Sequence, residues 1–106
     1  MTPIVVLITA KNSLEARKIA KVIVRKKMAA CCNILPAIRS IYQWEGKLCD
    51  DAEVLMIVKT TRNRFPALEK EVKALHSYSV PEIIALPIVL GSKPYVRWLG
   101  QSVGNP

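Results

Sequence analysis

The single histidine of the chain lies six residues before a carboxylate, and the two form a candidate metal or proton-transfer site. His76 is followed by Tyr78 and then by Glu82. Divalent ions accept imidazole nitrogen and carboxylate oxygen as ligands, and a nearby carboxylate also alters histidine titration. The intervening loop decides whether the two groups converge. The alternative is a loop histidine that lies at the surface or bonds to backbone.

Two adjacent cysteines offer a second kind of chemistry. Cys31 and Cys32 point to opposite sides if they lie in a strand. Thiolates favour soft metals such as Cu(I), whereas a buried cysteine ordinarily packs as a small hydrophobic residue. Cys49 makes the number of cysteines three, and no CxxC motif occurs. Unpaired thiols fit a reducing compartment, so we expect a cytoplasmic protein.

Aromatic and basic side chains near strand ends suggest a ligand pocket. Tyr42 and Trp44 alternate with polar residues and could form an aromatic wall. Hairpin packing or a subunit contact is the alternative, because such contacts are rich in aromatic residues. Lys59 could attract an anion or pair with Glu82, or it could simply be solvated. No nucleophile–base pair and no carboxylate dyad stands out, so we do not expect an enzyme.

Three apolar runs form the strands that must position these residues. They are Ile4–Ile8, Val54–Val58 and Ile83–Leu90, the last interrupted by a proline. A strand that is apolar at every position is shielded from water on both faces. A chain of 106 residues has too few helices to cover both faces of one sheet. The second face is therefore expected to meet another copy of the protein.

The hydrophobic periodicities predict four strands and three helices in a single domain, residues 1–106. Asn12 or Ser13 should cap the first helix, with Glu15 three residues after Asn12 as in a capping box, and Asn63 should cap the second helix. Pro36 should bend the second strand. The acidic segment Cys49–Glu53 should be exposed, and the C-terminal helix should turn Tyr95, Trp98 and Leu99 inward. The expected strands cover about 3–10, 29–44, 48–60 and 82–90, and the first two helices about 13–27 and 63–75.

This order of elements predicts an α+β fold, the ferredoxin-like βαββαβ sandwich with an extra C-terminal helix. Both main helices lie on one side of a four-stranded antiparallel sheet in that fold, and the other side is bare. The apolar strands indicate that the bare side is not exposed to water. A dimer or trimer whose sheets face inward would cover it.

The net charge of +8 permits an anionic partner. RNA-recognition modules stack bases on aromatic residues of the third strand, and Val54–Lys59 has none, so nucleic acid is not expected by that mode. No apolar stretch reaches the ~18 residues that span a bilayer, and no signal peptide is recognisable, so no membrane partner is expected. A solvated helix face explains the six clustered basic residues Arg17, Lys18, Lys21, Arg25, Lys26 and Lys27.

Four ordered motifs resemble the CutA divalent-cation tolerance family. They are Ala29–Pro36, Ser40–Lys47, Ile57–Thr60 and Pro81–Pro87, and the resemblance covers nearly the whole chain. It implies a ferredoxin-like homotrimer in the cytoplasm that is linked to tolerance of divalent metals, copper above all. The architecture also resembles the PII-type signalling trimers, which bind small ligands in clefts between subunits.

The resemblance also implies site residues. His76, Glu82 and Cys31 match family positions that make them metal-ligand candidates, with Cys32 beside them. Ile8 stands where some members carry a cysteine. The positions expected to line the cleft between subunits are Tyr42, Trp44, Lys59, Tyr78 and Glu82.

Three functions therefore stand as hypotheses. The favoured one is a non-enzymatic homotrimer that binds a divalent metal ion, copper above all. The second is a PII-like sensor that holds a small anionic ligand near Lys59, Tyr42 and Trp44. The third is a structural or scaffolding trimer whose ligand sites are vestigial.

Overall fold

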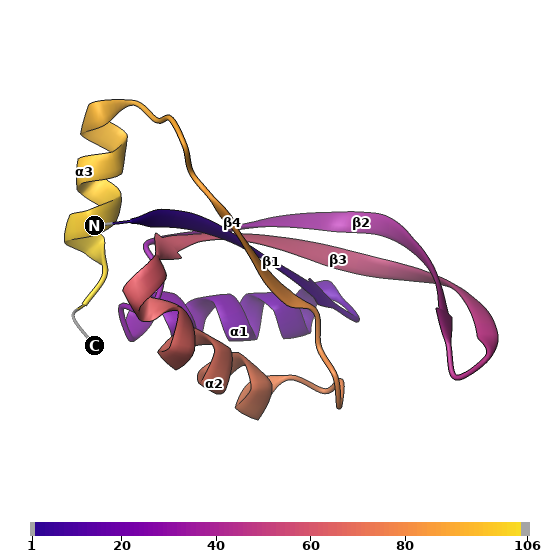
Figure 1. The fold of residues 1–106 in the computed structure, drawn as a ribbon. Coiled ribbons are helices and arrows are strands. Elements are labelled where there is room, and N and C mark those ends of the chain that lie inside the picture. The colour runs from indigo at the N-terminus through magenta and orange to yellow at the C-terminus, as the bar shows by residue number, and fades with distance from the viewer. Residues whose placement is uncertain (1, 105–106) are drawn as a thin grey trace.

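Two helices cover one face of a four-stranded antiparallel sheet in the computed structural model, which describes residues 2–104 (Figure 1). The strands are β1 (Pro3–Ala10), β2 (Cys31–Trp44), β3 (Lys47–Thr61) and β4 (Ile83–Pro87), in the spatial order β2-β3-β1-β4. The helices are α1 (Ser13–Arg25), α2 (Phe65–Leu75) and α3 (Lys93–Ser102), and a short 3-10 turn, η1 (Arg62–Arg64), precedes α2. The predicted α+β sandwich is confirmed.

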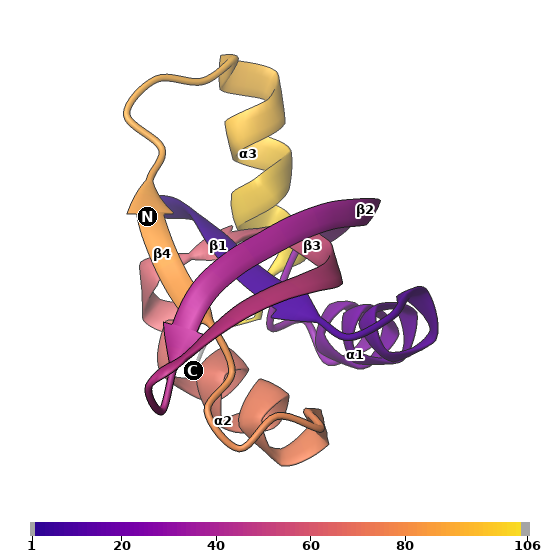
Figure 2. The ribbon, with the colours of Figure 1, turned by 90° about the vertical axis from the view of Figure 1, so that its right-hand side faces the viewer.

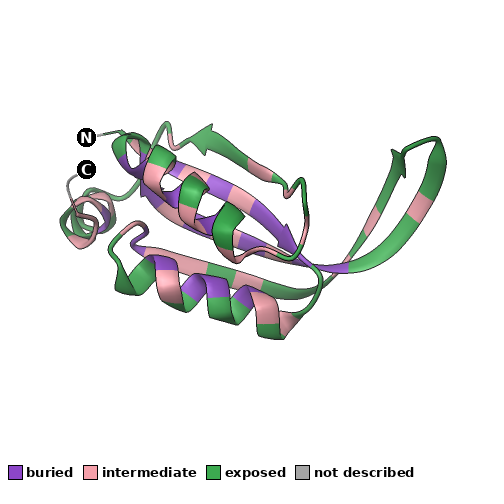
Figure 3. Ribbon diagram, turned by 90° about the horizontal axis from the view of Figure 1, so that it is seen from below, coloured by how far each residue is buried: buried purple, intermediate pink, exposed green. Residues whose placement is uncertain are grey.

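The hydrophobic core lies between the sheet and the helices α1 and α2. Alternate residues of β1 and β3 are buried in it, as are residues along one side of both helices (Figure 3). Burial of each large aliphatic side chain contributes roughly 1.5–3 kcal/mol, so this layer is the main source of stability. The fully buried members include Val6, Ile8, Ile19, Ile23, Met56, Val58, Leu68 and Val72.

The start of α1 is fixed by the cap that its sequence predicts. The Asn12 Oδ1 accepts a hydrogen bond from the Glu15 N–H at 2.8 Å. The Glu15 carboxylate in turn accepts one from the Lys11 N–H at 3.3 Å. Such a reciprocal arrangement satisfies N–H groups that a helix start leaves unpaired. It also places Glu15 beside the loop that follows α2.

Strands β2 and β3 form a long hairpin that projects beyond the other two strands (Figures 1 and 2). Glu45 and Gly46 form its two-residue turn, both with positive φ (49° and 80°). That conformation matches the twist of the paired strands. The register shifts between Leu35 and Ile38, which confirms the predicted irregularity at Pro36.

Two expected element boundaries are wrong. The last strand ends at Pro87 rather than near residue 90, since only Ile83–Pro87 pairs with β1. Asn63 does not cap the second helix, because it lies inside η1 and accepts a hydrogen bond from the Thr61 hydroxyl. The residue before α2 is Arg64, which makes no side-chain capping bond.

The face of the sheet opposite α1 and α2 is apolar and largely uncovered. We call it the open face; it comprises Val5, Leu7, Leu35, Leu55, Ile57, Ile84 and Leu86. Ile84 is 53% exposed and Leu86 is 50% exposed. An apolar patch of this kind ordinarily marks an interaction surface.

Helix α3 rises on the same side as the open face but covers only one end of it (Figure 2). Leu99 anchors this helix and is fully buried. The expected inward orientation is therefore confirmed for Leu99, but it is wrong in the single chain for Tyr95 and Trp98, which are each 44% exposed. Within residues 2–104, no helix is long and apolar enough to cross a membrane.

Candidate functional site

A cavity of about 660 Å³ lies between the β2–β3 hairpin and the loop that leads from α2 to β4. Its volume is typical of small-ligand sites. Two carboxylates, Glu53 and Glu82, and three aromatic rings, Tyr42, Trp44 and Tyr78, line it. None of its lining residues within the described chain is a lysine, arginine or histidine. We call it the acidic pocket, and its charge favours a cationic ligand.

Glu53 is the carboxylate that the sequence argument missed. It was expected to be exposed with the rest of residues 49–53, but it is only 9% exposed. The Tyr78 hydroxyl donates a hydrogen bond to its Oε2 at 2.7 Å. Burial, and then this hydrogen bond, raise the pKa of Tyr78, so the phenol keeps the proton that it donates. Only the three-dimensional meeting of β3 with the loop could reveal this pair.

Glu82 shares the acidic pocket with Glu53. Its carboxylate makes no hydrogen bond or ion pair with any residue of the described segment 2–104. Partial burial, and then the negative charge of Glu53, raise the pKa of Glu82. Two carboxylates that repel each other without a counter-ion are stabilised when a cation binds between them.

The aromatic wall of the acidic pocket comes from the hairpin, as one reading of the sequence predicted. Tyr42 and Trp44 both line the cavity, and each is partly exposed. The Tyr42 hydroxyl donates to the Asp51 carboxylate at 2.5 Å. This hydrogen bond is the main reason that the pKa of Tyr42 rises to about 12. Asp51 thereby fixes the direction of the Tyr42 ring.

His76 is buried beside the acidic pocket but does not line it. Its Nδ1 accepts a hydrogen bond from the Tyr78 N–H at 3.1 Å. The proton of the neutral ring is therefore on Nε2, which donates to the Thr9 carbonyl at 2.7 Å. The ring also packs against Tyr78, with centroids 4.7 Å apart. Since both ring nitrogens are engaged, a metal ion would have to displace one of these hydrogen bonds.

Cys31 and Lys59 lie together at the opposite end of the sheet. Cys31 on β2 pairs with Lys59 on β3. Tyr42 pairs with Cys49, which lies ten residues from Lys59 along β3. Ten residues of strand span about 34 Å, so one chain does not bring these two side chains to the acidic pocket. The expected grouping of Lys59 with Tyr42 and Trp44 concerns a cleft between subunits, and it stays a prediction. A metal site that combines Cys31 with His76 and Glu82 would likewise need Cys31 from a second chain.

The local contacts of the two adjacent cysteines and of Lys59 also differ. The Cys31 Sγ lies 3.6 Å from the Tyr95 hydroxyl, and the Lys59 ammonium bonds to the Asn33 amide oxygen. Cys32 packs against the core, and burial raises the pKa of its thiol to about 12. The opposite orientation of the pair is as predicted. No group of three metal-binding side chains gathers anywhere within residues 2–104.

Glu15 holds the loop that carries Tyr78. Its Oε2 accepts a hydrogen bond from the Ser77 N–H at 3.0 Å, in addition to the bond from Lys11. Burial alone would raise the pKa of Glu15, but the hydrogen bonds from Ser77 and Lys11 outweigh it, and the pKa is lowered. The Glu15 carboxylate therefore stabilises the folded protein in its ionised form.

The Glu15→Gln variant is expected to be less stable than the unmodified protein by about 1 kcal/mol at neutral pH, because charge-assisted hydrogen bonds become neutral ones. A lowered folded-state pKa gives stability that is complete above the unfolded value, near 4.5, and is lost as the pH falls through the folded value. Urea unfolding at several pH values measures the free energy of unfolding of both proteins and its dependence on pH. The difference between the two proteins should shrink on acidification, and a constant difference would contradict this role.

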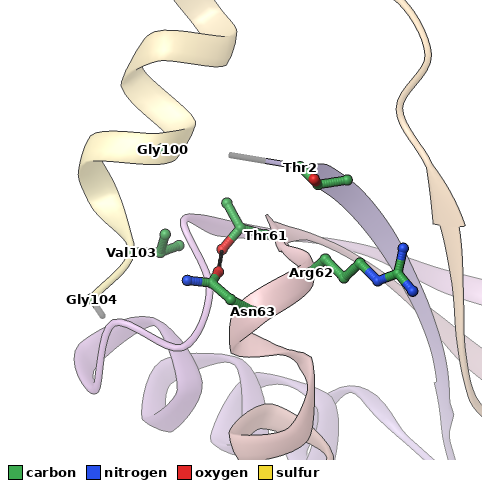
Figure 4. Close-up of a pocket in the computed structure, with 7 residues that line it drawn as sticks. All are labelled: Thr2, Thr61, Arg62, Asn63, Gly100, Val103 and Gly104. Carbon is green, nitrogen blue, oxygen red and sulfur yellow. Dashed lines mark hydrogen bonds between the residues drawn. The ribbon is translucent and has the colours of Figure 1, made fainter. Parts of the chain in front are cut away.

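A second cavity, of about 550 Å³, lies where the start of β1, the end of β3 and the end of α3 meet (Figure 4). The Thr61 hydroxyl and the Asn63 side chain line it but bond to each other. The Arg62 side chain points away from Asn63 and Val103 (Figure 4). The polar side chains here are thus engaged or directed elsewhere, and this cavity does not gather a set of ligating groups.

Known proteins resemble this chain over nearly its whole length. A family model described as CutA1 divalent ion tolerance protein matches residues 4–102. The divalent-cation tolerance protein CutA of Thermus thermophilus is 51% identical over 100 residues, which cover 94% of this chain and 97% of that protein. The chloroplastic CutA of Arabidopsis thaliana is 48% identical over 96% of this chain, but the chain spans only 56% of that protein.

Solved structures agree with the sequence comparisons. The CutA1 structure from Oryza sativa superposes with a TM-score of 0.95 at 46% identity, covering 98% of this chain and 95% of that chain. The Thermus thermophilus structure gives a TM-score of 0.94 at 50% identity, covering 96% and 99% of the two chains. On the joint match of sequence and fold, the chain belongs to the CutA1 divalent ion tolerance protein family.

Proposed function

We propose that this protein is a non-enzymatic homotrimer that binds a divalent metal ion, copper above all, in the acidic pocket. The observation that carries the proposal is the meeting of Glu53 and Glu82 without a cationic side chain among the lining residues. A divalent cation neutralises both carboxylates and removes their mutual repulsion. The family is named for tolerance of divalent ions, which agrees with this chemistry.

Copper is the divalent metal that oxygen and nitrogen ligands of this kind bind most tightly. Oxygen and nitrogen ligands bind Cu²⁺ more tightly than the other divalent ions of the first transition row. Glu53 and Glu82 are the first candidates as ligands because they already line the same cavity. His76 is a third candidate, provided that the loop releases the Tyr78 N–H from its Nδ1. Cys31 could join them only from a second copy of the chain.

The open face supports the trimer. Aliphatic side chains such as Ile84 and Leu86 are half exposed in the single chain, and sister copies whose sheets face inward would bury them. Thr9 and Glu53 point to the same side of the sheet as Leu7 and Leu55, so the acidic pocket opens at the edge of this surface. The three free thiols support a reducing, cytoplasmic location.

Calorimetric titration with Cu²⁺ and Zn²⁺ tests the proposal, with light scattering of the same samples to measure the mass. We expect saturable heat for Cu²⁺ and weaker heat for Zn²⁺. The His76→Ala variant separates the two roles of the histidine. Identical isotherms for the variant and the unmodified protein would leave His76 as a positioning residue, whereas loss of binding in a folded variant would make it a ligand. Flat titrations of the unmodified protein with both metals would refute metal binding.

A small-molecule sensor is the second candidate, and the volume and aromatic wall of the acidic pocket favour it. The charge of the pocket changes the expected ligand, because the anion predicted near Tyr42 and Trp44 would face two carboxylates. A cleft that adds Lys59 to these residues needs two copies of the chain. A thermal-shift screen of organic anions against organic amines distinguishes the two ligand classes. No observation favours a purely structural trimer over these two functions.

A further inference from the structure

The outer side of α1 carries a row of cations that the proposed function does not use. Arg17, Lys18, Lys21 and Arg25 are all exposed, while the opposite side of the helix packs into the core. Figure 3, seen from the helix side, shows exposed residues repeating along this helix. None of the four cations forms an ion pair within residues 2–104. We call this row the basic stripe.

Acidic side chains lie away from the basic stripe. The only acid on α1 is Glu15, whose carboxylate is held by Lys11 and Ser77. On α2, Glu69 pairs with Lys73 and Glu71 pairs with Lys26. Four of the other acids belong to the β2–β3 hairpin, which projects away from the helix layer (Figure 1): Glu45, Asp50, Asp51 and Glu53. The positive charge of α1 is therefore not neutralised locally.

We propose that the basic stripe binds the phosphate backbone of double-stranded nucleic acid without reading its sequence. Arg17 and Arg25 are eight residues apart, so the stripe is about 12 Å long. A duplex carries one charge per ~1.7 Å of axis, or about seven phosphate charges over that length. Four cations facing such a row release counter-ions, which is the driving force of sequence-independent binding.

Two features of the same helix decide the kind of partner. The basic stripe carries no aromatic side chain for stacking unpaired bases, which favours backbone contact with a duplex. A helix that lies in a lipid interface buries a broad apolar side in the membrane, but the apolar side of α1 covers the sheet. The prediction against nucleic acid concerned base stacking on the third strand. The sequence also suggested that the basic side of this helix is only solvated, and the present proposal replaces that interpretation.

Fluorescence anisotropy with a labelled short DNA duplex, at salt concentrations from about 50 to about 200 mM, tests the proposal. Four phosphate contacts give a log–log slope of about −3.6, so the affinity of the unmodified protein should fall about 100-fold across this range. The variant with Arg17, Lys18, Lys21 and Arg25 all replaced by Gln should bind at least about 100-fold more weakly at the low-salt end, because it loses all four contacts. Circular dichroism and light scattering establish that it folds and assembles normally.

The matched control replaces two other arginines and two other lysines, Arg62, Lys47, Lys93 and Arg97, with Gln. These four are exposed, lie outside α1 and change the net charge equally. The proposal expects the control to keep the salt slope of the unmodified protein. Equal losses in both variants would mean that only net charge matters and would overturn it. So would absent binding by the unmodified protein, or tighter binding to phosphatidylcholine–phosphatidylserine vesicles than to the duplex.

Discussion

The Ile84→Glu variant is expected to have the mass of one chain, where the proposed trimer has the mass of three. Ile84 lies on the open face and is 53% exposed in the single chain, so a glutamate there leaves the monomer folded. In a trimer with inward-facing sheets, the same glutamate would be buried without a cation. Burying one unpaired charge costs several kcal/mol, and a trimer would bury three. Light scattering at micromolar concentration measures the result.

The matched control for Ile84 is Leu14→Glu. Leu14 is 77% exposed on α1, outside the open face, and the change also replaces an aliphatic side chain with a carboxylate. This variant should keep the mass of the unmodified protein. If Ile84→Glu also kept that mass, the open face would not be the contact surface. A monomeric unmodified protein would remove the trimer from the proposal altogether.

Substitution of either carboxylate in the acidic pocket is expected to weaken Cu²⁺ binding at least about tenfold. Loss of an outer-shell partner alone costs about 10- to 100-fold in metal affinity, and a direct ligand should cost no less. Glu53→Gln still accepts the Tyr78 hydrogen bond, and Glu82→Gln breaks no hydrogen bond of the described chain. Both variants should therefore fold, and calorimetric titration compares them with the unmodified protein.

The control for these variants is Glu69→Gln, which removes a carboxylate from α2 and breaks only an exposed pair with Lys73. It should bind Cu²⁺ normally. If all three variants bound copper as the unmodified protein does, the acidic pocket would not be the site. Acidification should also weaken binding, because protons compete for the carboxylates. The raised pKa of Glu82 makes this loss begin at a higher pH than an ordinary glutamate would.

Local patterns in the sequence were sufficient for most of the fold. The helical spacing of apolar residues and the capping residues predicted α1 from Asn12 onward. Pro36 predicted the irregular stretch of β2. The failures are where tertiary contacts override a local pattern. Asn63 has the chemistry of a cap, yet the chain forms η1 there and the amide bonds to Thr61 instead.

The candidate site could be predicted only in part, because its residues come from distant segments. Tyr42, Trp44, Tyr78 and Glu82, which were expected at a cleft between subunits, line one cavity of the single chain. Lys59 does not, since the hairpin pairs it with Cys31 at the far end of the sheet. In the sequence, Glu53 is one more polar residue at an acidic strand end. In the fold it is buried beside the Tyr78 hydroxyl, which lies 25 residues further along the chain.

The register shift in β2 decides what faces the carboxylates. Before it, Leu35 pairs with Leu55; after it, Ile38 pairs with Glu53, so the alternation of side chains along β2 is reversed relative to β3. Tyr42 and Trp44 lie on the same side of the sheet as Glu53 for this reason alone. If β2 kept all its residues but paired one-to-one with β3 through Pro36, Tyr42 and Trp44 would face the opposite surface, and the two glutamates would lose their aromatic neighbours.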